Sequence, residues 1–209
     1  MGEDNARVVW ECPYWRVEES RYTGSDGRDR TWYTARRPNP NTVHMLGLTV
    51  DGQVPVLKQW RAPLGTHVWE LPAGVCDVEG EAMMEAAARE LEEETGYRPG
   101  EVHHLFSGTV SPGLTDELYH AYLCLDLQRV SEGGGTGGEL IEVRHVPFRH
   151  LPAFLLALQR NGELVDAKVL THVTLAMQRL VELASQDKET GETRYADLAD
   201  NVVGGGSEQ

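Results

Sequence analysis

Hydrophobic and polar positions alternate with different periods along the chain, and these periods predict the strands. Residues 8–37 alternate aromatic and polar side chains around Gly24-Ser25-Asp26-Gly27, which is typical of a hairpin. Strands are also predicted at 43–50 and 54–60, joined as a second hairpin by the turn residues Asp51-Gly52. Later apolar runs predict strands near 102–110, 117–126 and 140–147.

Three other segments show the helical period instead. Residues 81–95 are followed by Gly96, a residue that commonly ends a helix in the left-handed conformation. Helices are also predicted at 149–160 and 165–185. The apolar stripes of the first and last helices are Met84, Ala87, Ala88, Leu91 and Thr95, and Val169, Val173, Met177 and Leu180. This order of elements favours an α/β protein in which a mixed sheet is sandwiched between helices.

Breaks in the pattern divide the chain into three parts. Pro38-Asn39-Pro40-Asn41 ends the first part, so residues 1–42 are predicted to form an N-terminal antiparallel β extension. Residues 43–185 form the main domain, and the polar residues 186–209 are predicted to be a mobile acidic tail. The glycine-rich residues 131–138 lack the Lys-Ser/Thr ending of a phosphate loop and are interpreted as a flexible loop.

Composition restricts the partners and the location. The net charge of −14 and the pI near 4.9 argue against nucleic acid as an unaided partner, because phosphates would be repelled. No apolar run is as long as a membrane span, and the acidic start MGEDNARVVW does not resemble a signal peptide, so we expect no membrane partner and a cytoplasmic location. The three cysteines are too few and too widely spaced for a disulfide framework or a zinc site.

The helix at 81–95 carries an unusual concentration of acid. The stretch RELEEETGY places Glu90 and Glu94 one turn apart, with Glu93 on their flank. A run of charge is usually a solvated helix face, but this helix also has an apolar stripe and should be docked. Three carboxylates that converge on a docked helix are well suited to bind a hard divalent cation such as Mg²⁺.

Residues 74–97 resemble the Nudix box, a G-x5-E-x7-R-E-U-x-E-E-x-G-U pattern in which U is a bulky apolar residue. The matching positions are Glu81, Arg89-Glu90-Leu91, Glu93-Glu94 and Gly96-Tyr97. Six residues separate Gly74 from Glu81 where the box has five, which leaves the path of that loop open. The resemblance implies a Nudix α/β/α sandwich. It also implies that Mg²⁺, or Mn²⁺, is held by Glu90, Glu93, Glu94 and the Ala73 carbonyl, and that Arg89 orients the glutamates.

Features outside the box are similar to the ADP-ribose pyrophosphatase branch of the family. Pro112, in Ser111-Pro112-Gly113, lies sixteen residues after Gly96, and Gln59-Trp60-Arg61-Ala62-Pro63 resembles that branch's approach to the box. The resemblance implies that Arg61 contacts substrate phosphate and that Pro112 and Gly113 border the substrate. It also implies a homodimer in which the N-terminal extension crosses to the partner.

The N-terminal extension is rich in aromatic side chains, which a short segment cannot bury alone. They are Trp10, Tyr14, Trp15, Tyr22, Trp32 and Tyr33. Packing on the core accounts for most of them, and Tyr14 or Trp15 is the candidate for stacking on adenine.

The implied reaction is hydrolysis of ADP-ribose to AMP and ribose 5-phosphate, with Arg89 and Glu93 as part of the catalytic apparatus. The general base is expected on a late loop at Glu139, with Glu142 or Glu117 as alternatives. Two other functions stay open: a pyrophosphatase for nucleotide sugars such as GDP-mannose, and a non-catalytic protein that binds ADP-ribose.

Overall fold

Two mixed β-sheets form the body of the molecule in the computed structural model, which describes residues 6–136, 138, 140–191 and 193–203. The first sheet has the order β7-β4-β10-β9, with β4 and β10 parallel and the other pairs antiparallel. The second has the order β12-β5-β6-β13, and only β13 and β6 are parallel. The strands are β4 (Asn41–Gly47), β5 (Gln53–Arg61), β6 (Thr66–Glu70), β7 (Ala73–Val75), β9 (Glu101–Thr109), β10 (Leu118–Leu125), β12 (Ile141–Pro147) and β13 (Leu164–Val165).

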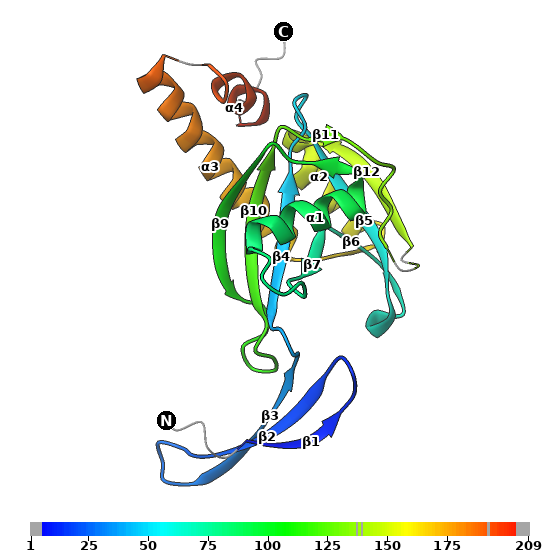
Figure 1. The fold of residues 1–209 in the computed structure, drawn as a ribbon, viewed down its shortest axis with the longest axis vertical. Coiled ribbons are helices and arrows are strands. Elements are labelled where there is room, and N and C mark those ends of the chain that lie inside the picture. The colour runs from blue at the N-terminus through cyan, green and yellow to red at the C-terminus, as the bar shows by residue number, and fades with distance from the viewer. Residues whose placement is uncertain (1–5, 137, 139, 192, 204–209) are drawn as a thin grey trace.

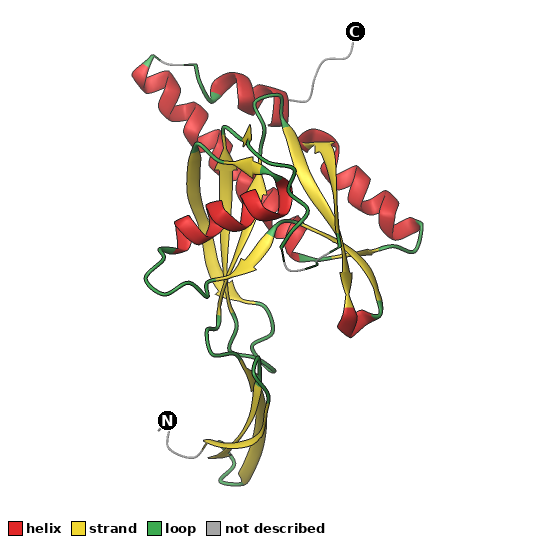
Figure 2. Ribbon diagram, turned by 45° about the vertical axis from the view of Figure 1, so that its right-hand side comes forward, coloured by secondary structure: helices red, strands yellow, loops and turns green. Residues whose placement is uncertain are grey.

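Helices cover both sides of the sheets, as Figures 1 and 2 show. They are α1 (Met83–Thr95), α2 (Leu151–Arg160), α3 (Lys168–Thr190) and α4 (Ala196–Val203). The short elements are η1 (Ala62–Leu64), η2 (Phe148–His150), β8 (Tyr97–Arg98) and β11 (Gln128–Arg129). The predicted α/β class is confirmed, with two mixed sheets rather than one. Among the described helices, none combines the length and the apolar character needed to cross a bilayer.

The alternation of side chains along β4 separates two hydrophobic clusters. Val43 and Met45 point to one face, where they pack with Ala87 and Leu91 of α1. Leu46 points to the other face and joins the larger cluster formed with α2 and α3. Because successive side chains of a strand point to opposite faces, one buried strand docks helices on both sides. The alternate residues Thr42 and His44 therefore face away from α1.

The N-terminal extension is a three-stranded antiparallel sheet rather than a single hairpin. It consists of β1 (Ala6–Glu11), β2 (Arg16–Thr23) and β3 (Asp29–Arg36), and it projects from the body (Figures 1 and 2). It contacts the loop before β10, where Trp32 Nε1 donates to the Gly113 carbonyl at 3.1 Å and the Ala35 amide donates to the Leu114 carbonyl at 2.8 Å. Arg36 pairs with Asp116 at 2.8 Å.

Two local predictions are wrong. The turn at Asp51-Gly52 exists, but β4 and β5 lie in different sheets and do not pair as a hairpin. Each of these buried strands has two other strands as its partners, so the turn links the sheets. Met84 was expected on the buried stripe of α1 and is instead 51% exposed, because the first turn of the helix reaches past the sheet and Ala86 takes the buried position.

The described residues after 185 are packed rather than forming a mobile tail. The last helix of the body continues to Thr190, and α4 follows a turn. Tyr195 and Leu198 pack against the larger hydrophobic cluster, and Ala199 is buried. The buried carboxylate of Asp187 accepts a hydrogen bond from the Ala196 amide at 3.0 Å. The segment was misjudged because its few apolar residues are widely spaced in a polar sequence.

Candidate active site

The acidic end of α1 is set by local sequence. The Glu85 side chain accepts from the Ala82 amide at 3.1 Å at the first turn, and Gly96, with φ of 79°, caps the last turn through its amide and the Glu92 carbonyl. Between these ends, Leu91 is fully buried in the core, which fixes the rotation of the helix. The carboxylates one step around the helix are therefore held at the edge of the sheet.

Arg89 is the cation at the centre of the acidic cluster. Its guanidinium donates to both oxygens of Glu81, at 2.9 and 3.0 Å, and to Glu90 Oε1 at 2.8 Å. Glu93 Oε1 lies 3.5 Å from the same guanidinium. The hydrogen bond with Glu81 raises the pKa of Arg89, and the same bond lowers the pKa of Glu81. The structure thus gathers Glu81, Glu90 and Glu93 around the arginine that the resemblance assigns to orient them.

Glu90 and Glu94 reach the backbone at Ala73-Gly74. A Cβ atom at Gly74 would lie 2.0 Å from the Glu90 carboxyl carbon, so only glycine permits this close approach. Burial raises the pKa of Glu90, while the ion pair with Arg89 acts in the opposite direction. Glu94 is 5% exposed and accepts a hydrogen bond from the Ala73 amide at 2.9 Å. The strand β7, which begins at Ala73, therefore lies directly beside two of the predicted metal ligands, Glu90 and Glu94.

The donors at this position fit a hard cation. Carboxylate and carbonyl oxygens are the ligands that Mg²⁺ and Mn²⁺ accept, and the predicted set contains only oxygen. Within the described residues, no three acidic, histidine or cysteine side chains already converge as a preformed cluster. Glu90 and Glu93 are held by Arg89, and Glu94 by the Ala73 amide. A cation at this position would compete with Arg89 for Glu90 and Glu93.

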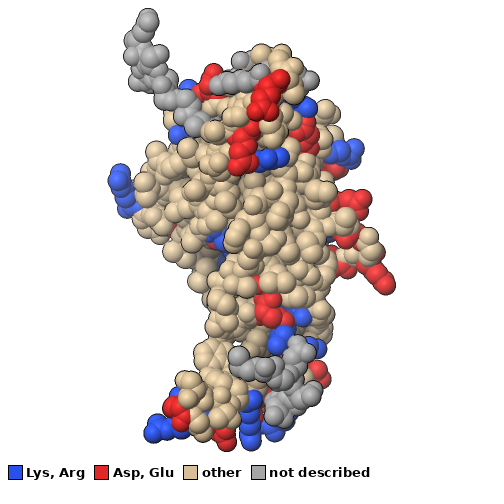
Figure 3. Space-filling model, turned by 90° about the vertical axis from the view of Figure 1, so that its left-hand side faces the viewer, with Lys and Arg blue, Asp and Glu red and all other residues tan. Residues whose placement is uncertain are grey.

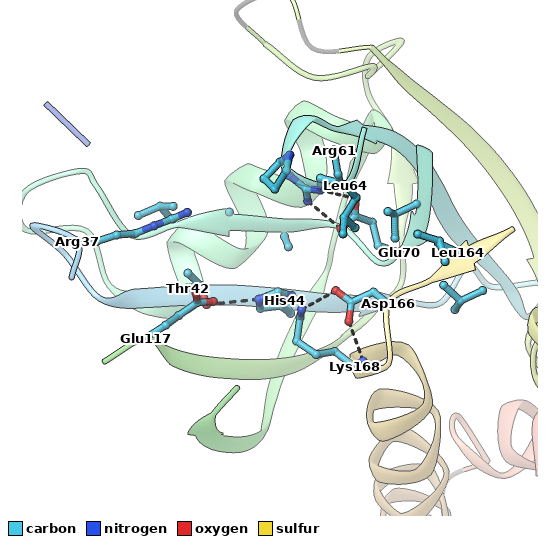
Figure 4. Close-up of a pocket in the computed structure, with 16 residues that line it drawn as sticks. Arg37, Thr42, His44, Arg61, Leu64, Glu70, Glu117, Leu164, Asp166 and Lys168 are labelled. Atoms are coloured by element: carbon cyan, nitrogen blue, oxygen red, sulfur yellow. Dashed lines mark hydrogen bonds and ion pairs between the residues drawn. The ribbon is translucent and has the colours of Figure 1, made fainter. Parts of the chain in front are cut away.

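A cavity of 470 Å³ adjoins the same backbone on the side away from α1. Its walls come from segments that are distant in sequence: the residue after β3, β4, the end of β5 with η1, β6, β7, the residue before β10, and the junction of β13 with α3 (Figure 4). The polar and charged lining residues are Arg37, Thr42, His44, Arg61, Glu70, Glu117, Asp166 and Lys168. The apolar and backbone lining comes from Pro63, Leu64, Val68, Ala73, Gly74, Val75, Leu164 and Val165.

Arg61 lines the cavity, as expected of a phosphate ligand, and it is held by Glu70. Two parallel hydrogen bonds of 2.8 Å join its guanidinium to the two oxygens of the Glu70 carboxylate. Burial raises the pKa of Glu70, and the Arg61 charge only partly offsets this effect. Burial also opposes the charge of Arg61, but hydrogen bonding and attraction to Glu70 outweigh it and raise the pKa of Arg61. The pair fixes a cation at the wall of the cavity.

His44 lies at the centre of the cavity floor. Its Nε2 atom is 3.3 Å from Thr42 Oγ1, and that hydroxyl donates to Glu117 Oε1 at 3.2 Å. Burial lowers the pKa of His44 well below its usual range, and the charge of Lys168 adds to this effect, so His44 is neutral at physiological pH. Neither His44 nor Glu70 was predicted as a site residue, although Glu70 lies in the stretch Trp69-Glu70-Leu71-Pro72-Ala73-Gly74 that leads into the box.

A second cavity, of 580 Å³, adjoins the first and is lined by the aromatic residues predicted for adenine stacking. Tyr14 and Trp15 line it together with Asp77, and both cavities share Arg37 and Val75. The Arg37 guanidinium lies 4.4 Å from the centre of the Trp15 ring, which is a cation–π contact. Tyr14 is 75% exposed. An aromatic cavity therefore adjoins the main cavity within a single chain.

The remaining predicted residues are not all brought together. Pro112 and Gly113 do not line the main cavity, and Gly113 contacts Trp32 of the N-terminal sheet. Glu117 lines the main cavity, whereas Glu142 lines a separate one with Lys58 and His67. Glu139 lies outside the described residues.

Part of the predicted flexible loop is docked on α1. The Gly134 and Gly135 amides donate to the carbonyls of Glu94 and Glu93, at 2.8 and 3.0 Å. These bonds satisfy carbonyls at the end of the helix that would otherwise lack partners. The described glycines therefore hold the end of α1 that carries the carboxylates.

Known proteins resemble this chain in sequence and in fold. Residues 38–172 match the family model described as the NUDIX domain, so the chain belongs to the Nudix family. The ADP-ribose pyrophosphatase of Bacillus subtilis (strain 168) is 34% identical over 131 residues, which are 62% of this chain and 68% of that protein. The ADP-sugar pyrophosphatase of Mus musculus is 32% identical over 181 residues, covering 79% of this chain and 82% of that protein.

A solved structure supports the same fold. The crystal structure of an ADP compounds hydrolase superposes with a TM-score of 0.72 at 21% identity, covering 86% of this chain and 94% of that one. The predicted family and fold class are therefore confirmed.

Proposed function

We propose that the protein hydrolyses the diphosphate bond of ADP-ribose to AMP and ribose 5-phosphate. The observation that carries this proposal is that the carboxylates of α1 and the main cavity both adjoin the backbone of Ala73 and Gly74. The carboxylates of α1 lie on one side of it, and the cavity with Arg61 lies on the other. The aromatic subsite at Trp15 continues from that cavity. A diphosphate beside this backbone would therefore place its nucleoside toward Trp15.

The residues divide the chemical work. Glu90, Glu93, Glu94 and the Ala73 carbonyl would hold Mg²⁺, or Mn²⁺, and the ion would supply charge neutralisation on the diphosphate and activation of water. Arg89 orients the glutamates and Arg61 binds phosphate. The oxygen of water bonds to one phosphorus, the bridging oxygen leaves with the other phosphate, and a carboxylate takes the proton from the water.

Of the three candidates for the general base, Glu142 lines a separate cavity with Lys58 and His67, so Glu139 and Glu117 are compared first. Glu139 is the position that the family resemblance implies. Glu117 is supported by its position in the main cavity, where its carboxylate accepts a hydrogen bond from the Thr42 hydroxyl. Comparing Glu117→Gln with Glu139→Gln separates them, because loss of the base removes the acidic limb of the pH profile, where kcat rises as the base loses its proton, and loss of a binding group does not.

We also propose a homodimer assembled through residues 1–42. The three-stranded sheet of this extension exposes large apolar side chains, which are unfavourable in water and typical of an interface. They are Val8, Val9, Trp10, Trp32 and Tyr33. Above the sheet, on the β9 side of the molecule, Figure 3 shows a broad face with few charged side chains. Sedimentation equilibrium with Trp10→Asp tests the dimer, since a charge at the interface should release monomers.

The runner-up enzyme acts on nucleotide sugars such as GDP-mannose, and the non-catalytic alternative only binds ADP-ribose. The network of Arg89 with three intact glutamates supports catalysis. Neither the base-binding subsite nor Arg61 separates adenine from guanine. The cytoplasmic location stays a prediction.

The first experiment is hydrolysis by the purified protein with Mg²⁺ of ADP-ribose, GDP-mannose, NADH and diadenosine polyphosphates, with AMP and ribose 5-phosphate identified as products. The proposal expects the highest kcat/KM with ADP-ribose and loss of turnover when the metal is chelated. Fastest turnover of GDP-mannose would favour the runner-up. ADP-ribose that raises the melting temperature without turnover under Mg²⁺ or Mn²⁺ would establish the non-catalytic alternative.

A further inference from the structure

The main cavity has two chemically different ends, which Figure 4 separates. Arg37 and Glu117 lie at the end that continues into the Trp15 subsite. Asp166 and Lys168 lie at the other end with Leu164, and His44 lies between the two. If the nucleoside occupies the Trp15 end and the diphosphate lies beside Ala73-Gly74, the group on the far phosphate meets Asp166 and Lys168. This step rests on the proposed function.

Asp166 is rigidly placed by the main chain. The strand β13 pairs in parallel with β6, and the Asp166 amide continues the ladder by donating to the Trp69 carbonyl at 2.9 Å. The next turn begins α3, whose Lys168 amide donates to the Asp166 carboxylate at 2.8 Å. A side chain fixed from both directions presents its oxygens to the cavity without much loss of conformational entropy on binding.

The pair retains capacity to bind a ligand. Lys168 Nζ donates to Asp166 at 2.5 Å, and the two side chains are 28% and 20% exposed. The contacts with Lys168 occupy two of the roughly four acceptor positions of a carboxylate, and an ammonium has about three donors. Acceptors and donors side by side suit neighbouring hydroxyls, each of which both donates and accepts. Leu164 and Val165 supply an apolar wall for the carbon face of a sugar ring.

We infer that Asp166 and Lys168 bind vicinal hydroxyls of the sugar on the far phosphate, so that they select nucleoside diphosphates esterified to a polyol. Neither residue belongs to the Nudix box, and α1 does not touch this end of the cavity. The pair acts as a specificity determinant: it favours a substrate by its sugar and leaves the chemistry at the diphosphate unchanged.

The test compares two substrates that differ only in this group: ADP-ribose and the β-methyl ester of ADP, which has the same diphosphate without the hydroxyls. Asp166→Asn keeps an oxygen to accept from the Lys168 amide, so the start of α3 is preserved. We expect it to lower kcat/KM for ADP-ribose by at least about tenfold, because hydrogen bonds to a charged acceptor are lost. The value for the methyl ester should stay within about twofold of the wild type.

Lys168→Met is the second variant and should show the same selective loss. Glu189→Gln, an exposed acid on the same helix, is the matched control and should change neither substrate. Equal losses with both substrates, or no loss with either, would overturn the inference.

Failure of the proposed function is recognised separately, because it appears in the wild type as no hydrolysis of ADP-ribose. Calorimetry then decides the inference from binding alone. A Kd for ADP-ribose that is about tenfold weaker in Asp166→Asn supports the pair. Equal Kd values, or no binding by the wild type, reject it.

Discussion

The carboxylates of α1 and the walls of the main cavity meet at the Ala73-Gly74 backbone, yet they are built from the chain in opposite ways. The first group comes from one continuous segment, in which helical periodicity places each glutamate. The second combines seven segments between Arg37 and Lys168. The chemistry of the site is thus a local property of the sequence, whereas recognition of the substrate is a property of the tertiary fold.

Loss of a carboxylate should have the largest effect and should spare binding. Glu93→Gln is expected to lower kcat about 10³-fold with little change in KM, because charge stabilisation by a bound ion is worth several kcal/mol. Steady-state kinetics with ADP-ribose and saturating Mg²⁺ measure this. The control is Glu92→Gln on the same helix, which pairs with Arg98 at 2.8 Å and should retain kcat. A kcat within tenfold of the wild type in Glu93→Gln would contradict a catalytic role for the cluster.

A substitution at Gly74, where the carboxylates of α1 meet the main cavity, should affect both of these regions together. Gly74→Ala places a methyl group 2.0 Å from the Glu90 carboxyl carbon, so the carboxylate or the strand must move. Misplacement of catalytic groups by about 1 Å costs roughly 10²-fold in rate. We expect kcat/KM to fall by about that factor while far-ultraviolet circular dichroism is unchanged. A rate like that of the wild type would show that the contact with Gly74 does not position Glu90.

On the recognition side, Arg61→Met should reduce stability in a pH-dependent way. The variant leaves Glu70 buried without its cation, which raises the pKa of Glu70 further above its ordinary value of 4.5. Below that value the carboxyl is protonated in both states and little stability is lost. As pH rises through the folded-state pKa, Glu70 ionises without its cation, and the variant loses about 2 kcal/mol of its free energy of unfolding relative to the wild type. This loss is smaller than for a fully buried pair because Arg61 is 40% exposed.

Urea unfolding at about pH 4 and about pH 8 measures this difference for the wild type and the variant. Arg98→Met, which breaks the exposed pair with Glu92, is the control and should show little pH-dependent change. A loss of stability that is independent of pH would show that packing rather than the charge of Glu70 is at stake.

The smallest effect is expected at the aromatic subsite. Trp15→Ala should raise KM for ADP-ribose about tenfold with kcat nearly unchanged, because stacking of an aromatic ring on a base is worth about 1–3 kcal/mol. The comparison variant is Tyr22→Ala on the same sheet, which removes an exposed aromatic that does not line this cavity. If both variants leave KM unchanged, the base binds elsewhere.

Strong periodic segments were predictable, and pairing between segments was not. The helix at 81–95 and its glycine end are correct to within two residues, because they depend on contacts of three or four positions. The predicted hairpin at Asp51-Gly52 is wrong because turn residues determine where the chain reverses direction, and they do not determine which strands pair. The prediction for the end of the chain failed because Tyr195 and Leu198 pack on a hydrophobic surface that exists only in the folded body.

The order of residues alone was enough to predict which helix carries the carboxylates, which arginine lies among them, and which loop precedes them. It also determined the Nudix family, since the spacing of the box is a local pattern. The packing of distant segments was needed to reveal that Arg61 is held by Glu70, that His44 is buried and neutral, and that Asp166 and Lys168 close the far end of the cavity. The physical reason is that helical neighbours interact within one turn, whereas a cavity exists only after distant segments have packed.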